Sequence, residues 1–325
     1  MTLHWLLRIL NILIGVIPGA VSQGVLWSLM SLGVYITFKV LDFADMTVDG
    51  SFALGGAICA SMILKGWNPF IAILCAIIAG LLAGMITGFL NTSLRIPAIL
   101  AGILTQLSLY SINLRIMGRA NLPLLNSKTM FDLINGMIQS ITGTRIKAQY
   151  LVLVVGILCA ILVIGILYWF FGTEIGSAIR ATGNNEKMMR ALGQNTNHTK
   201  VVALMLSNGL VALSGALVCM DNGYGDVGMG TGAIVIGLAS IVIGEVLLKY
   251  FKSFGMKLIA VVVGSILYRI VVAVVLQLGM NADDMKLLTA ILVAFALAVP
   301  VIAEKFRERF GKLDYEYLIE KEKDQ

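Results

Sequence analysis

The sequence predicts an all-α membrane protein, a polytopic bundle of about nine or ten transmembrane helices with a discontinuous helix near residues 42–51. Hydrophobic residues make up 58% of the 325-residue chain and charged residues 13%, and the mean hydropathy is +0.92. Soluble domains average about 45–50% apolar and about 25% charged residues. A segment that crosses a bilayer must satisfy its own backbone hydrogen bonds, so helices of roughly 20 residues are expected.

Apolar blocks of this length set the domain organisation. Residues 1–302 form a single transmembrane domain, and residues 303–325 form a charged cytoplasmic tail of mixed sign. Residues 1–20 either lead into the first span as an interfacial helix or form a signal peptide, and the first interpretation is favoured because the next span follows at once. The expected spans are 14–38, 46–64, 70–91, 97–117, 150–171, 201–220, 230–248, 256–278 and 285–302.

Lysine and arginine near the span ends predict the orientation, because basic residues are retained on the cytoplasmic side. The loop 172–200, the turn 249–257 and the start of the tail are rich in these residues and belong inside. The loops 221–230 and 279–286 are acidic and belong outside. An odd number of spans before residue 172 places the amino terminus outside, and a further span within residues 1–20 places it inside. The sequence is compatible with both numbers of spans.

The loop 118–149 is expected outside, although it carries four basic residues. Apolar residues recur in it at helical spacing, which predicts an amphipathic helix on the outer face. This helix either packs the long loop against the spans or docks an external partner. Its apolar residues are Met130, Leu133, Ile134, Met137, Ile138 and Ile141.

The inventory of reactive groups argues against an enzyme. The four cysteines lie in apolar blocks without CxxC spacing, and two histidines leave little material for a metal site or a catalytic triad. We expect no catalytic residue, no metal and no cofactor on this chain. No GxxxxGK[ST] phosphate loop occurs, so if the protein is driven by ATP, the nucleotide must bind a different chain. The net charge of +6 needs no nucleic acid, because anionic lipid headgroups meet the bases at the span ends.

Three carboxylates interrupt the chain at the junction of the first two spans. Residues 42–51 hold Asp42, Asp45 and Asp49, followed by a glycine. Irregular backbone is tolerated in a membrane only where it meets protein or water, so a broken helix beside a transport path is expected. A plain interfacial turn is the alternative for Asp42 and Asp45. The path residues predicted here are Thr47, Asp49 and Ser51.

The fourth expected span carries polar residues on one helix face. Gln106, Tyr110 and Asn113 follow one another at i, i+4 and i+7. They either line a polar route or hydrogen-bond to neighbouring helices. Asn208 and Glu245 lie inside later apolar spans and are therefore expected to be buried and to line the transport path as well. Glu245 could instead pair with Lys249, four residues on.

Close helix packing is predicted for the third span. Gly80, Gly84 and Gly88 form two overlapping GxxxG steps. Such steps let a neighbouring backbone approach closely, in many different membrane folds.

The loop 172–200 is the one long polar, helix-compatible segment inside the apolar chain. It mixes charged residues with an apolar side, which predicts a short amphipathic helix lying across the membrane end and ending at Gly193. An ordinary solvated connection is the alternative, but the missing phosphate loop favours docking of a soluble partner. The apolar side consists of Ile175, Ile179, Met188, Met189 and Leu192.

Two motifs carry a resemblance to a known family. Residues 176–185 (GSAIRATGNN), 191–193 (ALG) and 202–217 resemble the corresponding pattern of permease subunits in ABC importers of the branched-chain amino acid and ribose type. Residues 45–51 (DMTVDGS) resemble that family's broken second helix. Within the family, the runs at 47–52 and 243–247 are most similar to those of tryptophan or tyrosine transporter permeases.

The resemblance implies a homodimer in the plasma membrane of a bacterium that imports a small solute, with an aromatic amino acid as the first guess. A cytoplasmic ATPase would carry ATP and Mg²⁺, and an external binding protein would deliver the solute. The loop 172–200 would be the coupling segment, and the solute would pass near the broken helix and the fourth span. The implied coupling residues are Gly176, Arg180, Asn184, Asn185, Glu186, Arg190, Leu192 and Gly193.

Other classes of protein make different predictions. An ion- or proton-coupled secondary transporter would use Asp49 and Glu245 as coupling charges and would need no ATPase. A scaffold protein leaves Asp49 and the polar face of the fourth span unexplained. A membrane enzyme is disfavoured because no two candidate catalytic groups fall together.

Overall fold

The structure is a computed structural model that describes residues 2–125, 127–143, 145–248 and 253–277, together with scattered positions between 284 and 298. Helices make up nearly all of it, which confirms the predicted all-α class. The elements are α1 (Thr2–Tyr35), the π-helix η1 (Ile36–Val40), α2 (Thr47–Leu64), α3 (Pro69–Thr92), α4 (Ala98–Met117), β1 (Asn121–Pro123), α5 (Met130–Thr142), α6 (Ala148–Gly172), α7 (Glu174–Asn184), α8 (Glu186–Ala191), α9 (Thr196–Asn222), β2 (Tyr224–Asp226), α10 (Ala233–Leu247) and α11 (Phe254–Gln277).

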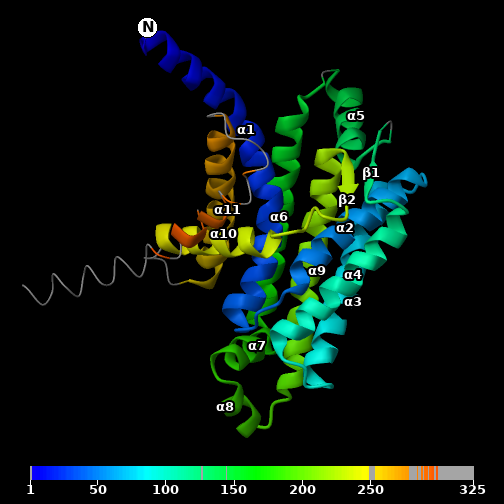
Figure 1. The fold of residues 1–325 in the computed structure, drawn as a ribbon, viewed down its shortest axis with the longest axis vertical. Helices are drawn as coiled ribbons and strands as arrows, with labels where there is room; N and C mark the ends of the chain where they lie inside the picture. Colours follow the sequence, from blue (N-terminus) through cyan, green and yellow to red (C-terminus); the bar gives the residue numbers. More distant parts are fainter. Residues whose placement is uncertain are drawn as a thin grey trace, which may run out of the picture.

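Seven helices of the described residues are long and apolar enough to cross a membrane, and they match seven of the expected spans. α1 contains both the first span and the amino-terminal residues before it. The amino-terminal end of α1 lies at the other end of the bundle from α7 and α8 (Figure 1). The expected span 230–248 is a helix of only 15 residues, α10, which runs across the bundle in Figure 1. The expected span 285–302 and the tail 303–325 lie largely or wholly outside the described residues.

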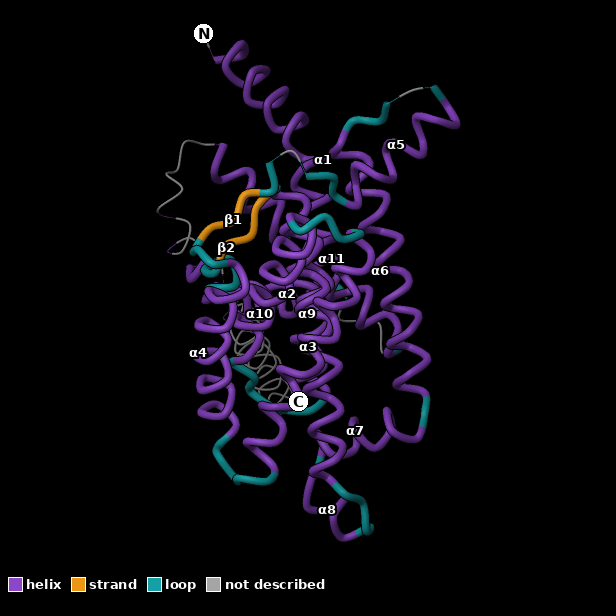
Figure 2. The backbone as a smooth tube through the Cα atoms, turned by 90° about the vertical axis from the view of Figure 1, so that its right-hand side faces the viewer, coloured by secondary structure: helices purple, strands orange, loops and turns teal. Residues whose placement is uncertain are grey.

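The two ends of the bundle differ in structure. β1 and β2 pair antiparallel, with Asn121 opposite Asp226, and lie with α5 at one end, whereas α7 and α8 lie at the other (Figure 2). α5 confirms the helix predicted within the loop 118–149. It begins with a capping box, because Thr129 and Asp132 each accept a hydrogen bond from the other's backbone N–H. We refer to these as the α5 end and the α7 end.

The interior is formed by α1, α2 and α9, whereas α3, α4 and α6 expose long apolar faces. The glycine steps of α3 lie against α9, as the GxxxG pattern predicts. A Cβ atom added at Gly80 would overlap the Asn208 carbonyl oxygen, and one added at Gly84 would overlap that of Leu204. The α3 and α9 backbones therefore touch along their length.

The helix discontinuity predicted near 42–51 is present between residues 41 and 46. η1 ends at Val40, and α2 begins at Thr47. Between them the backbone turns back on η1, since the N–H of Leu41 donates to Ile36 and that of Phe43 donates to Thr37, at 3.0 and 2.9 Å. Asp42 has φ of 56°, a left-handed conformation that is uncommon for a residue other than glycine. We call residues 41–46 the break.

A second interruption lies between α9 and α10. After β2 the chain turns inward until Gly230 packs against the backbone carbonyl of Asp49, and α10 begins there. α11 then starts at the α7 end, where Arg180 lies 5.5 Å from the centroid of the Phe254 ring. β2, the inward loop and α10 therefore lead from the α5 end to η1, where Glu245 of α10 contacts Lys39.

Candidate functional site

A buried polar cluster joins the break to α9. The amide nitrogen of Asn208 donates to the Asp45 carboxylate at 2.7 Å, and the Ser51 hydroxyl donates to the Asn208 amide oxygen at 2.6 Å. The other Asp45 oxygen accepts from the N–H of Thr47 at 2.9 Å. All four residues are buried. Buried carboxylates require such partners, so Asp45 fixes the start of α2 rather than forming the plain turn considered above.

Asp49 binds the amino terminus of α10. Its two carboxylate oxygens accept from the N–H groups of Gly232 and Ile234, at 2.9 and 3.0 Å. The first N–H groups of a helix lack partners within the helix and carry partial positive charge, so a carboxylate stabilises them. Gly232 has φ of 82°, which glycine adopts without strain. Asp49 therefore links the starts of two interrupted helices, and its place on a transport path stays a prediction.

Three threonines form a second buried chain, between α2, α3 and α4. The hydroxyls of Thr47 and Thr87 lie 2.7 Å apart, and the Thr87 hydroxyl lies 3.0 Å from that of Thr105. The sequence analysis placed Thr47 on the path but missed Thr87 and Thr105. A hydroxyl recurring within apolar spans is the signal that could have identified them.

The residues of the predicted polar face of α4 differ in how deeply they are buried. Asn113 is buried and donates to the Gly50 carbonyl at 3.3 Å, while its own amide oxygen accepts no hydrogen bond from any described residue. Gln106 is half-buried, and Tyr110 is 56% exposed on the outer side of the chain. Asn113 thus faces α2, whereas Tyr110 lies on the outer surface of the chain.

Glu245 pairs with a residue that the sequence analysis missed. Its carboxylate lies 2.9 Å from the ammonium group of Lys39 in η1, and both side chains are more than one-third exposed. Lys249, the partner considered above, lies outside the described residues. The broken helix therefore contacts α10 at both of its ends, through Lys39 on one side of the break and Asp49 on the other.

One further intramembrane charge was missed. Arg269 of α11 stacks its guanidinium over the Trp27 ring, 3.9 Å from the centroid, and Trp27 in turn stacks on Phe52 at 4.7 Å. The Arg269 Nε has no hydrogen-bond partner among the described residues. A single arginine inside the apolar run 256–278 was a detectable signal, because such residues are costly in a membrane and mark functional or structural contacts.

The loop 172–200 forms two helices instead of the single helix expected. Asn185 is extended, with φ of −158° and ψ of 94°, and its side chain accepts from the N–H of Met188 at 3.0 Å to start α8. Asparagine is a preferred N-cap residue, so the Asn184–Asn185 pair is a signal that the sequence analysis left unused. The chain leaves α8 at Gly193, which has φ of 81° and confirms the predicted end.

α8 is attached to α9 by charge. The Glu186 carboxylate lies 2.7 Å from Arg190 and 2.8 Å from Lys200, and it accepts from the Thr196 hydroxyl at 3.2 Å. Partial burial alone would raise the pKa of Glu186, but the hydrogen bond and charge of Lys200, then the charge of Arg190 and the Thr196 hydrogen bond, lower it overall. Glu186 is thus held ionised.

The implied coupling residues divide into two groups. Gly176 packs against the Phe170 carbonyl and Arg180 lies over Phe254, so these two hold α7 to the bundle. Asn184, Leu192 and Gly193 are exposed. Of the predicted apolar side, Ile179 and Met189 are buried. The three that remain available at the surface are Ile175, Met188 and Leu192, at 48%, 47% and 69% exposure.

α7 also contacts the broken helix directly. A Cβ atom added at Gly183 would overlap the carbonyl oxygen of Val40, the last residue of η1, and would lie 3.0 Å from the carbonyl carbon of Leu41 in the break. The Thr182 hydroxyl lies 3.3 Å from that of Thr199, which ties the same turn of α7 to α9. The exposed segment and the break are therefore in van der Waals contact.

Comparisons with known proteins find similarity over most of the chain. Residues 16–298 match the family described as "Branched-chain amino acid transport system / permease component". The chain is 42% identical to the tyrosine transport system permease protein of Clostridioides difficile (strain R20291), over 91% of this chain and 95% of that protein. It is 32% identical to the uncharacterized protein RP368 of Rickettsia prowazekii (strain Madrid E), over 86% and 95%. The solved structure of PsaBC from Streptococcus pneumoniae in complex with Fab aligns at 19% identity, over 78% and 88%, with a TM-score of 0.32.

The family match and the apolar helices together give the general function. The protein is a multi-pass component of the bacterial plasma membrane and a transport subunit rather than an enzyme. Since residues 16–298 match the model of this family, the chain belongs to the family of permease components of branched-chain amino acid transport systems.

Proposed function

We propose that this permease is the membrane subunit of an ATP-driven importer for an aromatic amino acid, with tyrosine as the first candidate. The observation that carries the proposal is the contact of Gly183 with Val40, which joins the exposed helices at the α7 end to the break. The named function of the Clostridioides difficile relative supports the solute.

A cytoplasmic ATPase would dock on α7 and α8. Three partly exposed apolar side chains, Ile175, Met188 and Leu192, lie on these helices next to charged residues. Apolar side chains gathered on a polar end of a membrane protein favour a protein partner. The α7 end is cytoplasmic in this proposal, consistent with the basic residues that the loop 172–200 carries.

Movement of α7 would reach α10 through the broken helix. α7 presses on Val40, while Lys39 holds Glu245 near one end of α10 and Asp49 holds the N–H groups at the other. A displacement of η1 relative to α2 would therefore shift α10. Packed elements of this kind switch between discrete arrangements, as an alternating-access transporter requires.

The solute path would lie between two copies of the chain. α4 exposes a broad face that includes Leu107 at 63% and Tyr110 at 56%, with the hydroxyl of Ser108 beside them. A second subunit covering this face would enclose Gln106 and Tyr110 near the break. An external binding protein would deliver the solute at the α5 end, where α5 and the paired strands lie.

The test is uptake of labelled tyrosine into vesicles that contain the permease, its ATPase and its binding protein. We expect uptake to require ATP on the side of the vesicle membrane that carries the ATPase. Uptake should fall severalfold for Leu192→Asp and for the double variant Asn185→Ala/Glu186→Ala. Leu125→Asp is the matched control for retention of the ATPase by the purified permease, because Leu125 is 78% exposed at the α5 end, away from α7 and α8.

The rival secondary transporter gives the opposite result. It predicts uptake by the permease alone, collapse of that uptake when the membrane potential is dissipated, and no effect of the Leu192 variant. Uptake that needs no ATPase would reject the proposed function.

A further inference from the structure

Arg269 places a positive charge inside the span α11 without an acidic partner. Its guanidinium lies over the Trp27 ring, 3.9 Å from the centroid, but no hydrogen bond or ion pair joins it to a described residue. Its Nε is enclosed by the chain. An ionised group inside a membrane span is costly, and such groups are normally paired or placed at a water-filled cavity. Arg269 therefore needs a counter-charge.

The helices around Arg269 offer no free carboxylate. α1, α6 and α11 contain no acidic residue. The one carboxylate of α2, Asp49, binds the amino terminus of α10, and the one carboxylate of α10, Glu245, pairs with Lys39. Asp221, the acidic residue of α9, accepts a hydrogen bond from Gln23 at 3.5 Å. These helices thus leave the charge of Arg269 uncompensated.

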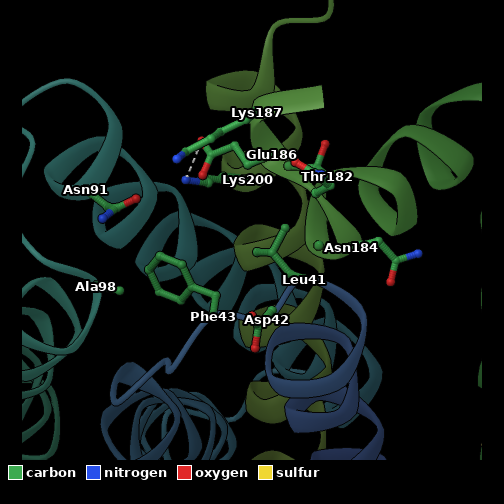
Figure 3. A pocket seen from close by; sticks show the side chains of 12 residues that line it. Leu41, Asp42, Phe43, Asn91, Ala98, Thr182, Asn184, Glu186, Lys187 and Lys200 are labelled. Atoms are coloured by element: carbon green, nitrogen blue, oxygen red, sulfur yellow. Dashed lines mark ion pairs between the residues drawn. The ribbon is translucent and has the colours of Figure 1, made fainter. Parts of the chain in front are cut away.

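The basic residues at the α7 end show a different arrangement. A cavity of about 460 Å³ opens there between the break and the junction of α7 and α8. In its wall Lys200 pairs with Glu186 at 2.8 Å (Figure 3). The other lysine of the wall, Lys187, is exposed, so water solvates it. Arg269 has neither a carboxylate partner among the described residues nor a position at the end of its helix.

The packing of α11 on α1 directs the guanidinium into the bundle. The two helices run in opposite directions, and a Cβ atom added at Gly24 would overlap the backbone of Ile266. The Ser265 hydroxyl donates to the Gly24 carbonyl beside this contact, at 2.9 Å. Trp27 lies on the α7 side of the contact and Arg269 on the α5 side. To reach the ring, the Arg269 side chain extends away from the nearer end of α11, whereas an arginine that reaches lipid headgroups extends toward it.

The contact with Trp27 leaves the hydrogen-bond donors of the guanidinium unused. An aromatic ring attracts the charge through its face, whereas the N–H groups point outward in the guanidinium plane. Trp27 stacks on Phe52 at 4.7 Å, and the two rings are only 8% and 0% exposed, so they support the guanidinium and offer no ligand surface. The rigid fork of N–H groups matches the two oxygens of a carboxylate.

We propose that Arg269, which is partly exposed, binds the carboxylate of a small ligand inside the bundle. The ligand would accept two hydrogen bonds from the guanidinium and neutralise its charge. Two sources share this chemistry, a free monocarboxylate from solution and the carboxylate of the transported amino acid. Only the second source rests on the proposed function, and it would give the solute a site within one chain, apart from the path between two α4 helices.

Binding is measured on the full-length permease in nanodiscs, with Trp27 as the only tryptophan after Trp5→Phe, Trp67→Phe and Trp169→Phe. Formate replaces chloride at constant ionic strength, and Trp27 emission is excited at a wavelength that tyrosine does not absorb. We expect a saturable change in emission. Arg269→Gln should weaken formate binding at least about tenfold, because the charged contact is lost. Arg269→Lys should weaken it severalfold, because it keeps the charge but not the fork.

The midpoint of thermal unfolding gives a second measurement, which does not depend on the surroundings of Trp27. Formate should raise the midpoint of the native chain but not that of Arg269→Gln, because a ligand stabilises only the fold that binds it. Arg115→Gln is the control and should respond like the native chain, since Arg115 is exposed in the last turn of α4. If Arg269→Gln fails to fold, Arg269→Lys decides the test.

Two further ligands identify the source of the carboxylate. L-Tyrosine that binds at least about tenfold more tightly than formate identifies the transported solute, provided that tyramine, which lacks the carboxylate, does not bind. Binding of formate without L-tyrosine identifies a free monocarboxylate.

Three results would overturn the site. They are no saturable response to formate or L-tyrosine, a response that neither Arg269 variant changes, and an equal response to tyramine. Failure of the proposed function is read separately, as absence of tyrosine uptake by the complete complex. Formate binding that depends on Arg269 supports the site whether or not uptake is found.

Discussion

Asn208 connects the two halves of the buried polar cluster, because one side chain both donates to Asp45 and accepts from Ser51. The amide of Asn208 supplies both the donor and the acceptor without adding charge. The cluster therefore depends on residue chemistry rather than on volume, which an apolar residue could fill equally well.

Asn208→Ala should destabilise the permease strongly. It leaves the buried Asp45 carboxylate without its amide donor, at a cost of about 3 kcal/mol. Thermal unfolding in detergent, followed by intrinsic fluorescence, should show a markedly lower midpoint. Ser108→Ala is the control, because it removes a side-chain hydrogen bond at an exposed position.

A double variant separates the contact from general damage. Asp45→Asn should destabilise on its own, but Asp45→Asn combined with Asn208→Ala should cost less than the sum of the two single changes. Additive losses would show that Asn208 and Asp45 act independently, contrary to the geometry.

Glu186 gives the coupling segment a defined dependence on pH. Its pKa in the folded protein lies below its ordinary value of 4.5, so its stabilisation of α8 is complete above that value and is lost as the pH falls through the folded pKa. Hydrogen exchange of residues 185–200 should therefore accelerate as the pH drops from about 5 to about 3, relative to the pH dependence expected for unfolded peptide.

Glu186→Gln removes the titrating group and should flatten this excess acceleration. Glu174→Gln, an exposed carboxylate in the first turn of α7, should leave it unchanged. Equal acceleration in the native chain and in Glu186→Gln would contradict the assignment.

At the scale of elements, α10 is a short helix whose two ends are held by the same broken helix. Its 15 residues are too few to cross a bilayer, and its first N–H groups would be unsatisfied without Asp49. Residues of the broken helix thus complete the hydrogen bonding of α10. The contact of Gly183 with Val40 lies, along the chain, between the two residues that hold α10, Lys39 and Asp49.

Gly183→Ala tests whether this contact transmits motion. The added methyl group would overlap the Val40 carbonyl, and relief of such overlap typically costs about 1–3 kcal/mol and a backbone shift. In the transport complex proposed above, the number of tyrosine molecules imported per ATP hydrolysed should fall severalfold. Gly172→Ala is the control, because a Cβ atom there meets no atom within 4 Å. Indistinguishable coupling in the two variants would exclude Gly183 from the route.

At the scale of the whole molecule, hydropathy predicted the helical bundle, because each residue contributes its own apolar character to the hydropathy of a span. The GxxxG steps predicted close packing, and the carboxylates of residues 42–51 predicted the discontinuity. The partners across the fold could not be predicted. Lys39 lies more than 200 residues from Glu245, and no local pattern joins them. The helical spacing of Gln106, Tyr110 and Asn113 gave a shared face, but contact with α2 buries only one edge of it.

The exposed faces of the described residues predict where the proposed second copy of the chain would bind. Leu107 on α4 is 63% exposed and Leu158 on α6 is 62% exposed, so the two are matched in accessibility and differ only in face. In a background with the four native cysteines replaced, Leu107→Cys should form a covalent dimer in native membranes on mild oxidation, because the proposed path lies between two α4 helices. Leu158→Cys should stay monomeric, because α6 would face lipid. Cross-linking through Leu158→Cys, or through neither position, would place the subunit interface elsewhere and remove Gln106 and Tyr110 from the path.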